Sequence, residues 1–371
     1  MKIGFVTTSF GFGPVAKAVY VALALQARHL SEVHLTFIGQ GIAYEYAQSN
    51  DCFDTLVEHN VDHDPDMAVT LLEPYDLIIN VMNLDVLARW TSPKPMIMID
   101  SLGWLWHSIP DGTEKAALYF LQDYLLPAER IEAFHRVTNT RVIPPIMDWP
   151  TVPTSKENVL LVNFSGSDNP FVQSTFFTDY AEVVGKIILE AAGTRFDHIY
   201  FATNRQLAAH LERVLSPSQL SFSCGYYSHE AFLDLLGRCR LLLTTPGITT
   251  TLEAMALRVD IGFLLPQNYS QALMAESYFH QHHYAKCIAL SRFDAMFALD
   301  SSLPEEIGVQ RVQGIVEVIL NQTTHRIMLT HLVTQLLEES ERNLAEIMQI
   351  DMHKEVGQQI IVNELVTTFL T

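Results

Sequence analysis

The sequence predicts an α/β protein made of two doubly wound domains, and three observations support this fold class. Short apolar runs alternate with stretches of helical periodicity along most of the 371 residues. The runs are rich in Val, Ile, Leu and Phe and are apolar on both faces, which is typical of parallel strands covered by helices on both sides. A proline-rich interval without periodicity, residues 141–158, separates two such series. We therefore expect two Rossmann-like domains of similar size, each large enough to bury its own core.

The first domain is predicted over residues 1–143. Its apolar runs have the length of strands, and the segments between them have helical spacing. The predicted strands are residues 3–8, 33–39, 76–81, 95–100 and 117–122, and the clearest helical segments are 15–28 and 128–135. Residues 144–157 are expected to form a stiff, extended interdomain linker, because proline holds the chain extended.

The second domain is predicted over residues 158–350 and repeats the alternation. Its predicted strands are residues 158–166, 197–203, 219–223, 240–245 and 260–266. From about residue 304 the pattern is almost continuously helical. Residues 351–371 are expected to form a C-terminal helix that packs back on the N-terminal domain. The predicted architecture is therefore two domains that face each other across a cleft, with a helical C-terminal segment.

Composition excludes several classes of partner. The formal net charge of −19 would repel the phosphates of nucleic acids and would gain nothing from an anionic membrane. No run approaches the roughly 18 apolar residues of a membrane span, and no signal-peptide pattern follows Lys2. The four cysteines are scattered without a C-x-x-C pair, which fits reduced thiols. We expect a cytoplasmic protein with no transmembrane segment and no nucleic-acid partner, and the oligomeric state is left open.

The stretch TTPGITTTLEA, residues 244–254, joins a predicted strand to a predicted helix. Pro246 ends the strand, Gly247 allows close approach of the backbone, and the threonines at 249–251 supply hydroxyl and N–H groups in the first helical turn. Such a helix N-terminus suits a phosphate or diphosphate. Glu253, one turn further on, can accept two hydrogen bonds from neighbouring ribose hydroxyls. An ordinary helix start with threonine caps is the alternative interpretation.

Two other strand ends in the same domain carry polar side chains. Residues 165–167, Ser165, Gly166 and Ser167, form a second possible phosphate loop, or else a plain turn. In PQNYSQ, the amides of Gln267, Asn268 and Gln271 can donate and accept hydrogen bonds, which suits sugar hydroxyls; a polar helix start is the alternative.

The order of segments in this region resembles the nucleotide-sugar half of GT-B glycosyltransferases: a predicted strand is followed by PGITTTLEAMAL, and a second predicted strand is followed by LLPQNYSQ. The nearest likeness is to the lipid-linked N-acetylglucosaminyltransferase of peptidoglycan synthesis and to the UDP-sugar glycosyltransferases of plants and antibiotic synthesis. The resemblance covers residues 158–290, and the N-terminal half shares only strand order and a glycine turn. It implies that Gly247, Ile248, Thr249 and Thr250 hold the diphosphate, Glu253 the ribose, and Gln267 and Gln271 the donor sugar. The pair Tyr226 and Tyr227 lies at the strand end where such transferases hold the uracil through backbone groups. A tyrosine there can stack on a base, and a partly buried tyrosine pair before a helix is the alternative. Ser270 occupies the position at which relatives carry an acidic residue. The resemblance therefore does not indicate which sugar hydroxyls the protein would bind.

The first domain is expected to bind the acceptor. Its glycine turn, TTSFGFGPVAKA, includes Gly13 at the start of a helix. Many relatives place a catalytic histidine in this turn, and this chain has none there. Asp100, at the end of the strand PMIMID, is the candidate replacement base, and His107 in the same loop is the second candidate. A turn or helix-capping aspartate is the alternative for Asp100, and Trp104 and Trp106 offer a flat apolar surface or core packing.

The resemblance and these residues predict a metal-independent, inverting transfer of a sugar from a nucleotide-sugar to a hydroxyl or amine acceptor, with no cofactor other than the donor substrate. That the donor is a UDP-sugar is implied by the resemblance alone. A nucleotide-sugar hydrolase or 2-epimerase, or a catalytically silent module, are the alternatives. Two acidic D-x-D strings at residues 62–66 and the histidine cluster at 280–283 resemble metal sites. We interpret both as surface features. The D-x-D strings lie far in sequence from every donor-site candidate, and the adjacent histidines of the cluster cannot share one helix face.

Overall fold

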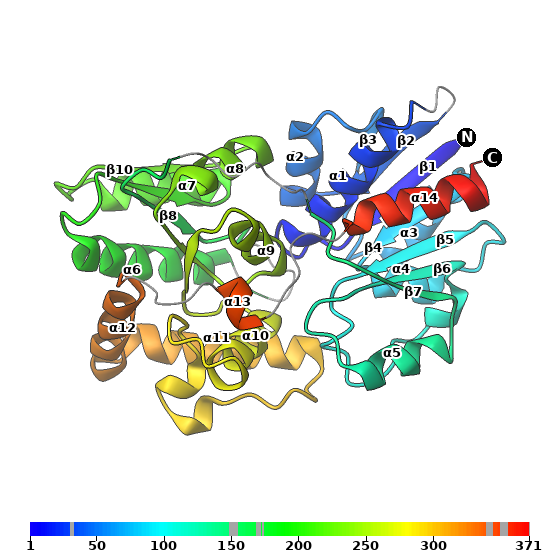
Figure 1. Cartoon of the computed structure of the whole chain (residues 1–371). Helices are drawn as coiled ribbons and strands as arrows, with labels where there is room; N and C mark the ends of the chain where they lie inside the picture. Colours follow the sequence, from blue (N-terminus) through cyan, green and yellow to red (C-terminus); the bar gives the residue numbers. More distant parts are fainter. Residues whose placement is uncertain are drawn as a thin grey trace. The chain divides into compact units, whose positions relative to one another are not determined.

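A computed structural model gives the fold (Figure 1) and describes residues 1–29, 33–147, 155–167, 172, 174–338, 344–348 and 355–370. The chain forms two compact units. Unit 1 comprises Met1–Asp148 and His353–Thr371, and unit 2 comprises Trp149–Met352. Part of the predicted linker, residues 148–154, lies outside the described residues.

Unit 1 is built on a seven-stranded parallel sheet with the strand order β3-β2-β1-β4-β5-β6-β7. The strands are β1 Lys2–Thr7, β2 His34–Gly39, β3 Thr55–Glu58, β4 Leu77–Val81, β5 Met96–Asp100, β6 Leu118–Gln122 and β7 Thr140–Ile143. The helices are α1 Gly13–Gln26, α2 Gly41–Ser49, α3 Pro65–Leu72, α4 Leu84–Arg89, α5 Ala128–His135 and α14 Gly357–Phe369.

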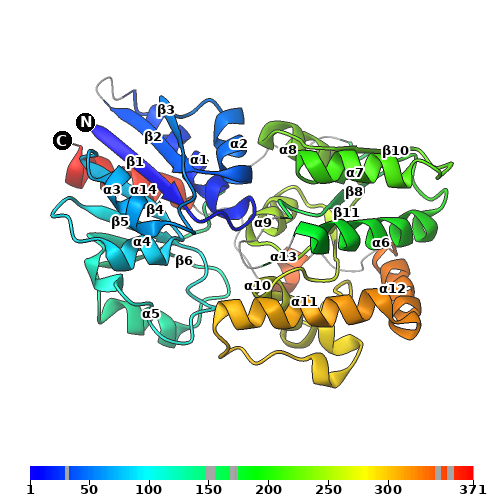
Figure 2. The same ribbon diagram turned by 180° about the vertical axis from the view of Figure 1, so that it is seen from behind.

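Each face of this sheet has its own apolar core because side chains alternate along the strands. In β6, Leu118 and Phe120 pack with residues of α1 and α14, whereas Tyr119 and Leu121 pack with Trp90 on the opposite face. Figures 1 and 2 show the two helical layers from the two sides.

Helix α14 completes unit 1 from the far end of the chain and packs on α1. The N–H of Gly357 donates to the Pro145 carbonyl at 2.9 Å. The side chain of Gln358 bonds both backbone groups of Met147. A Cβ at Gly357 would lie 2.3 Å from the Pro144 oxygen, so glycine is required for this close approach.

Unit 2 has a five-stranded parallel sheet with the order β10-β9-β8-β11-β12. Its elements are β8 Val159–Asn163, α6 Ser174–Ala192, β9 His198–Ala202, α7 Arg205–Leu215, β10 Phe222–Gly225, α8 His229–Arg238, β11 Leu241–Thr244, α9 Ile248–Ala256, β12 Asp260–Phe263, α10 Tyr269–Glu276, α11 Glu305–Asn321, α12 Thr323–Leu336 and α13 Leu344–Met348. The predicted α/β class with two doubly wound parallel sheets is confirmed.

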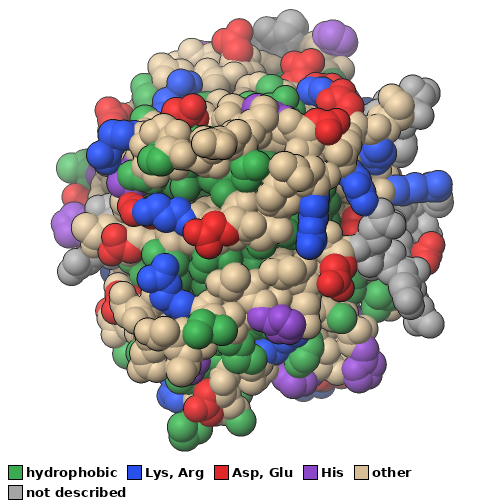
Figure 3. Space-filling model, turned by 90° about the vertical axis from the view of Figure 1, so that its left-hand side faces the viewer, with side chains coloured by type: hydrophobic (Ala, Val, Ile, Leu, Met, Phe, Trp, Pro, Cys, Tyr) green, Lys and Arg blue, Asp and Glu red, His purple; other side chains and the backbone are tan. Residues whose placement is uncertain are grey.

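Strand order locates the switch point of each sheet, where connections turn to opposite sides and ligands of such sheets bind at the carboxyl ends. In unit 1 it lies between β1 and β4, and in unit 2 between β8 and β11. On the face drawn in Figure 3, described acidic and basic side chains are interspersed instead of forming a patch of one sign. None of the described helices has the length and apolarity to cross a bilayer.

Candidate functional site

The predicted donor site lies at the unit 2 switch point, where β11 passes into α9. Thr244 ends the strand, and its hydroxyl accepts from the Asn163 amide at 3.2 Å and donates to the Thr245 carbonyl at 3.0 Å. Helix α9 then begins after Gly247, which has an extended backbone and provides no side-chain cap. The first-turn N–H groups of a helix have no acceptor within the helix, and the macrodipole places about half a positive charge there. The turn is therefore suited to an anion.

Three buried polar atoms after β11 and the neighbouring strand β12 have no hydrogen-bond partner among the described residues: Thr245 Oγ1, Thr251 Oγ1 and Gln267 Nε2. Each of these side chains is at most 2 % exposed. Since a buried unpaired polar group costs about 1–3 kcal/mol, such groups call for an explanation. All three can donate a hydrogen bond, so a bound anion would satisfy them. The sequence analysis did not identify Thr245 as a candidate site residue. The only signal for it in the sequence is its position directly after the strand.

Glu253 lies on α9 with its carboxylate buried beside an imidazole. His229, the first residue of α8, places Nε2 3.7 Å from Glu253 Oε1. Burial lowers the pKa of His229 from 6.5 to about 4, so the ring is neutral near pH 7. The carboxylate therefore has a polar, uncharged neighbour.

The predicted second phosphate loop is a tight turn after β8. Ser165 and Ser167 both have left-handed backbones, with φ of 55° and 45°. The Asn163 side chain accepts from the N–H of Ser165, the Ser167 hydroxyl donates to the Phe164 carbonyl, and Asn204 donates to the Gly166 carbonyl. Non-glycine residues adopt this conformation at a cost, and such strain gathers at binding sites. The turn is joined to the Thr244 corner through Asn163.

The amides of PQNYSQ are partly used by the protein itself. Asn268 caps α10 by accepting from the N–H of Gln271 at 3.0 Å. The Gln271 side chain accepts from the backbone N–H of Gln267 at 2.8 Å. The side-chain nitrogen of Gln267, Nε2, is buried and has no partner among the described residues. The helix-start alternative therefore accounts for the oxygen atoms of Asn268 and Gln271 but not for the Gln267 side chain.

The predicted base-binding corner follows β10. The Arg205 guanidinium lies 4.6 Å from the centre of the half-buried Tyr226 ring. Ser228 caps α8 by accepting from the N–H of Ala231. One face of Tyr226 is therefore already stacked, and a nucleobase would have to use the other face, the ring edge or the nearby backbone.

In unit 1, Asp100 occupies the predicted position at the end of β5, but its side chain is turned inward and is fully buried. Its carboxylate accepts from the N–H of Leu102, the indole N–H of Trp106 and the hydroxyl of Tyr119, each at 2.7 Å. Burial raises the pKa of Asp100, and these bonds and the charge of Lys17 oppose the rise. The bond to the N–H of Leu102 agrees with the alternative interpretation of Asp100 as a turn residue, and the role of Asp100 as a base stays a prediction.

The other predicted residues of unit 1 lie around the same sheet edge. His107 is exposed, and its carbonyl accepts from Arg130 at 3.1 Å. Gly13 begins α1, and its carbonyl accepts from Lys17 at 3.2 Å. Trp104 keeps a buried indole N–H without a partner among the described residues. The loop that carries His107 is held to the core through Trp106 and Asp100.

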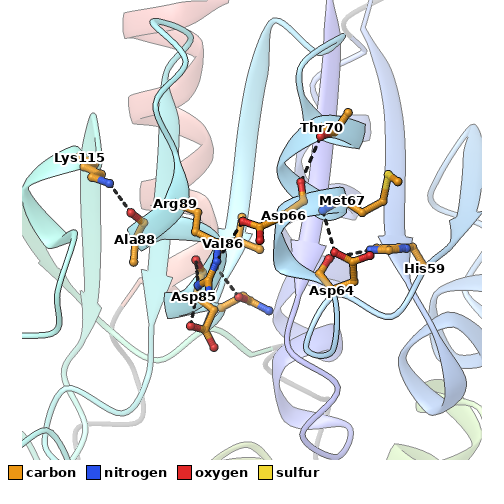
Figure 4. Close-up of polar contacts among 11 residues, drawn as sticks. His59, Asp64, Asp66, Met67, Thr70, Asp85, Val86, Ala88, Arg89 and Lys115 are labelled. Atoms are coloured by element: carbon orange, nitrogen blue, oxygen red, sulfur yellow. Dashed lines mark hydrogen bonds and ion pairs between the residues drawn. The ribbon is translucent and has the colours of Figure 1, made fainter.

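The two D-x-D strings have structural roles, which Figure 4 shows for Asp64 and Asp66. Asp64 caps α3 by accepting from the N–H of Met67, and Asp66 forms an ion pair of 3.2 Å with Arg89. Asp62 accepts from the N–H of Ser9 at 2.7 Å. Across the described parts of the chain, no group of three or more His, Cys, Asp or Glu side chains is placed to hold a metal ion.

The sequence matches no model of a known protein family, and no curated protein is significantly similar to it. Solved structures are similar over the full chain. A ugt transferase from Siraitia grosvenorii in complex with UDP has a TM-score of 0.51 and 9% identity, with 100% of both chains covered. UGT71G1 from Medicago truncatula complexed with UDP-glucose has a TM-score of 0.51 and 11% identity, with 99% of this chain and 97% of that chain covered. UGT89C1 from Arabidopsis thaliana complexed with quercetin has a TM-score of 0.51 and 12% identity, with 98% of each chain covered. The chain therefore has the GT-B fold of these transferases.

Proposed function

We propose that the chain is a glycosyltransferase that moves a sugar from a nucleotide-sugar, a UDP-sugar by our inference, to a hydroxyl or amine acceptor. One observation carries the proposal: buried donors without a partner among the described residues follow two neighbouring strands, Thr245 and Thr251 after β11 and Gln267 after β12. The charge that develops on a departing nucleoside diphosphate is what such donors stabilise. The GT-B fold, and the UDP and UDP-glucose bound to two of the similar structures, support the choice of ligand.

The donor contacts are assigned by strand position and by the family resemblance. The diphosphate is proposed to contact the turn at 247–250, namely Gly247, Ile248, Thr249 and Thr250, with Ser165, Gly166 and Ser167 as the second loop. Glu253 is proposed to bind the ribose diol. Tyr226 is proposed to border the base. Gln267, with Asn268 and Gln271, is proposed to bind the sugar.

The proposed reaction is one in-line displacement. The acceptor oxygen or nitrogen attacks the anomeric carbon, the bond from that carbon to the diphosphate oxygen breaks, and the acceptor proton passes to a base. Configuration at the sugar is therefore inverted. The positive end of α9 and its buried donors act on the leaving group, and we propose that neither a metal nor a cofactor is needed.

His107 is the base that we favour. Its exposed side chain can contact a ligand in solvent, and histidine is the side chain that most often acts as a general base. Asp100 is proposed as a positioning residue instead, because its carboxylate holds the loop through Trp106. Gly13 would then lie at the acceptor side of unit 1. We propose a cytoplasmic location, on the free state of all four cysteines.

A thermal-shift screen tests the proposal, because a ligand at 100 times its Kd stabilises the native state by about 2.7 kcal/mol. We expect UDP and a UDP-sugar to raise the melting temperature more than TDP, GDP or NAD do. Stabilisation by NAD alone would overturn the donor assignment. NMR of the product measures the anomeric configuration, and activity should persist with a chelator. Consumption of donor without acceptor would indicate hydrolysis or epimerisation instead.

A further inference from the structure

A second set of unpartnered polar atoms lies in unit 1, at the carboxyl ends of its strands. Thr7 ends β1, Ser9 follows it, and Gln122 ends β6. The hydroxyls of Thr7 and Ser9 and both amide atoms of Gln122 are buried and have no hydrogen-bond partner among the residues described. Gln122 is 1 % exposed. Four buried polar atoms at one edge of this sheet therefore have no hydrogen-bond partner among the described residues.

Gln122 carries most of the argument. Its neighbours Leu118 and Phe120 pack with α1 and α14, so strand alternation places Gln122 at the edge of the same face. An amide has both donors and acceptor lone pairs, and leaving both atoms buried and unpaired costs stability. Gln358 on α14 is buried to a similar degree, yet its amide is paired at both atoms with Met147. The fold can thus satisfy a buried glutamine in this unit, and Gln122 is left unsatisfied.

The spacing of the set indicates the size of a ligand. Thr7 and Ser9 lie at the β1–β4 switch point, and β6 is three strands away from β1. At about 4.8 Å between strands, the two ends are roughly 15 Å apart. A single sugar or benzene ring does not span that distance, whereas two or three joined rings do.

The charges near this edge offset each other. Burial raises the pKa of Asp100, and the buried Lys17 on α1 opposes that rise with its positive charge. Asp62 is engaged by the Ser9 backbone N–H and by Asn83. The apolar side chains of Phe12, Leu102 and Trp106 pack beside the same core. A neutral ligand with rings and a few polar groups fits these surroundings better than an anion.

We propose that Gln122 is a specificity-determining residue of the acceptor subsite that the proposed function places in unit 1, and that its amide pairs with a hydroxyl or carboxamide at the far end of an extended neutral acceptor. The inference rests on the proposed function. Such a site has a large effect on selectivity, because an acceptor that lacks the polar group leaves the Gln122 amide unpaired. Thr7 and Ser9 would contact the end nearer the switch point.

The test compares Gln122→Met with the matched control Gln358→Met. If Gln122 is unpaired in the free protein, its replacement raises the melting temperature of the full chain by about 2–6 °C, whereas the control lowers it. Acceptor selectivity is then measured with pairs of neutral phenolic glycosides that differ by one hydroxyl at the end remote from the reacting group. Wild type should favour the hydroxylated member at least about tenfold in kcat/KM, and Gln122→Met should reduce that ratio to about two or less.

A lower melting temperature in Gln122→Met would show that the amide is paired and would overturn the subsite. An unchanged selectivity ratio, or no wild-type turnover with any member of the pairs, would also overturn it. UDP binding, measured separately by thermal shift, decides the proposed donor site. Failure of the subsite with intact UDP binding is therefore distinguishable from failure of the transferase assignment.

Discussion

Thr244 and Thr245 are adjacent and each only 1 % exposed, yet the structure predicts opposite effects when each is changed to valine. The Thr244 hydroxyl is bonded to Asn163 and to the Thr245 carbonyl, whereas the Thr245 hydroxyl has no partner among the described residues. Valine keeps the branched shape and replaces the hydroxyl by a methyl group. Thr244→Val is therefore the matched control for Thr245→Val.

The magnitudes follow from the hydrogen bonds. Thr245→Val removes an unpaired buried hydroxyl, so the free energy of unfolding should rise by about 1–2 kcal/mol. Thr244→Val breaks two hydrogen bonds and leaves the Asn163 amide unpaired, so the free energy of unfolding should fall by about 1–3 kcal/mol. For a unit of about 200 residues, each kcal/mol corresponds to a shift of roughly 2–4 °C in Tm.

The Thr245 hydroxyl destabilises the free protein but is expected to stabilise the complex with UDP. A hydrogen bond to a charged diphosphate contributes about 1.5–3 kcal/mol, so Thr245→Val should weaken UDP binding about 10- to 100-fold. At 100 times the wild-type Kd, UDP stabilises wild type by about 2.7 kcal/mol; the variant should gain only about 0.4–1.4 kcal/mol. Urea denaturation with and without UDP measures both quantities. A Thr245→Val protein that is less stable than wild type, or that keeps the full gain from UDP, would refute the reasoning.

Three further predictions concern the titratable groups. Glu253→Gln should weaken UDP binding about tenfold or more and leave inorganic pyrophosphate binding within about twofold, measured by calorimetry, because the proposed ribose contact is absent from pyrophosphate; equal losses for both ligands would contradict the ribose role. Burial lowers the pKa of His229 from 6.5 to about 4, so the unfolded chain takes up a proton that the folded chain excludes, and stability should fall as pH drops from 6.5 to 4 by about 3 kcal/mol; in His229→Gln this part of the slope in urea titrations should disappear, and a persisting slope would assign it elsewhere. Asp100→Ala should cost about 3 kcal/mol or more of unfolding free energy through loss of its three hydrogen bonds, whereas His107→Ala should leave the midpoint of denaturation within about 0.5 kcal/mol of wild type and lower kcat by roughly 10²–10⁴; a fully active His107→Ala protein would exclude this imidazole as the base.

The fold class was predictable because buried parallel strands leave long apolar runs in the sequence. Short edge strands were not predictable in the same way. β3, Thr55–Glu58, and β7, Thr140–Ile143, have four residues each and are partly exposed, so they leave almost no periodic signal. The β7 residues therefore read as the end of a domain and the start of a proline-rich linker. The last predicted strand of the first domain, 117–122, agrees with β6 to within one residue.

The sequence predicts where in the fold the candidate site lies, but it does not predict which polar atoms of that site lack a hydrogen-bond partner. The sequence places threonines at the start of α9, because Pro246 and Gly247 mark the boundary between strand and helix. It does not tell which hydroxyl is satisfied, since the partner of Thr244 is Asn163, 81 residues earlier in the chain. The same limit applies to PQNYSQ, where the Asn268 oxygen is used to cap the next helix.

Two buried carboxylates, Asp100 at the end of β5 and Glu253 in α9, differ in environment, and we propose that this difference separates a structural acid from a ligand-binding one. Asp100 ends a strand and accepts from three protein donors, so burial of its charge is offset inside unit 1. Glu253 lies one turn into α9, with the neutral His229 as its neighbour and with unpartnered donors at Thr245 and Thr251 close by in sequence. Both residues are acidic, buried and near the carboxyl edge of a sheet, so sequence position alone cannot rank them. The state of the surrounding donors does: where protein groups already saturate a carboxylate, the residue holds a loop, and where donors around it stay unpaired, the site is built to be completed by a ligand.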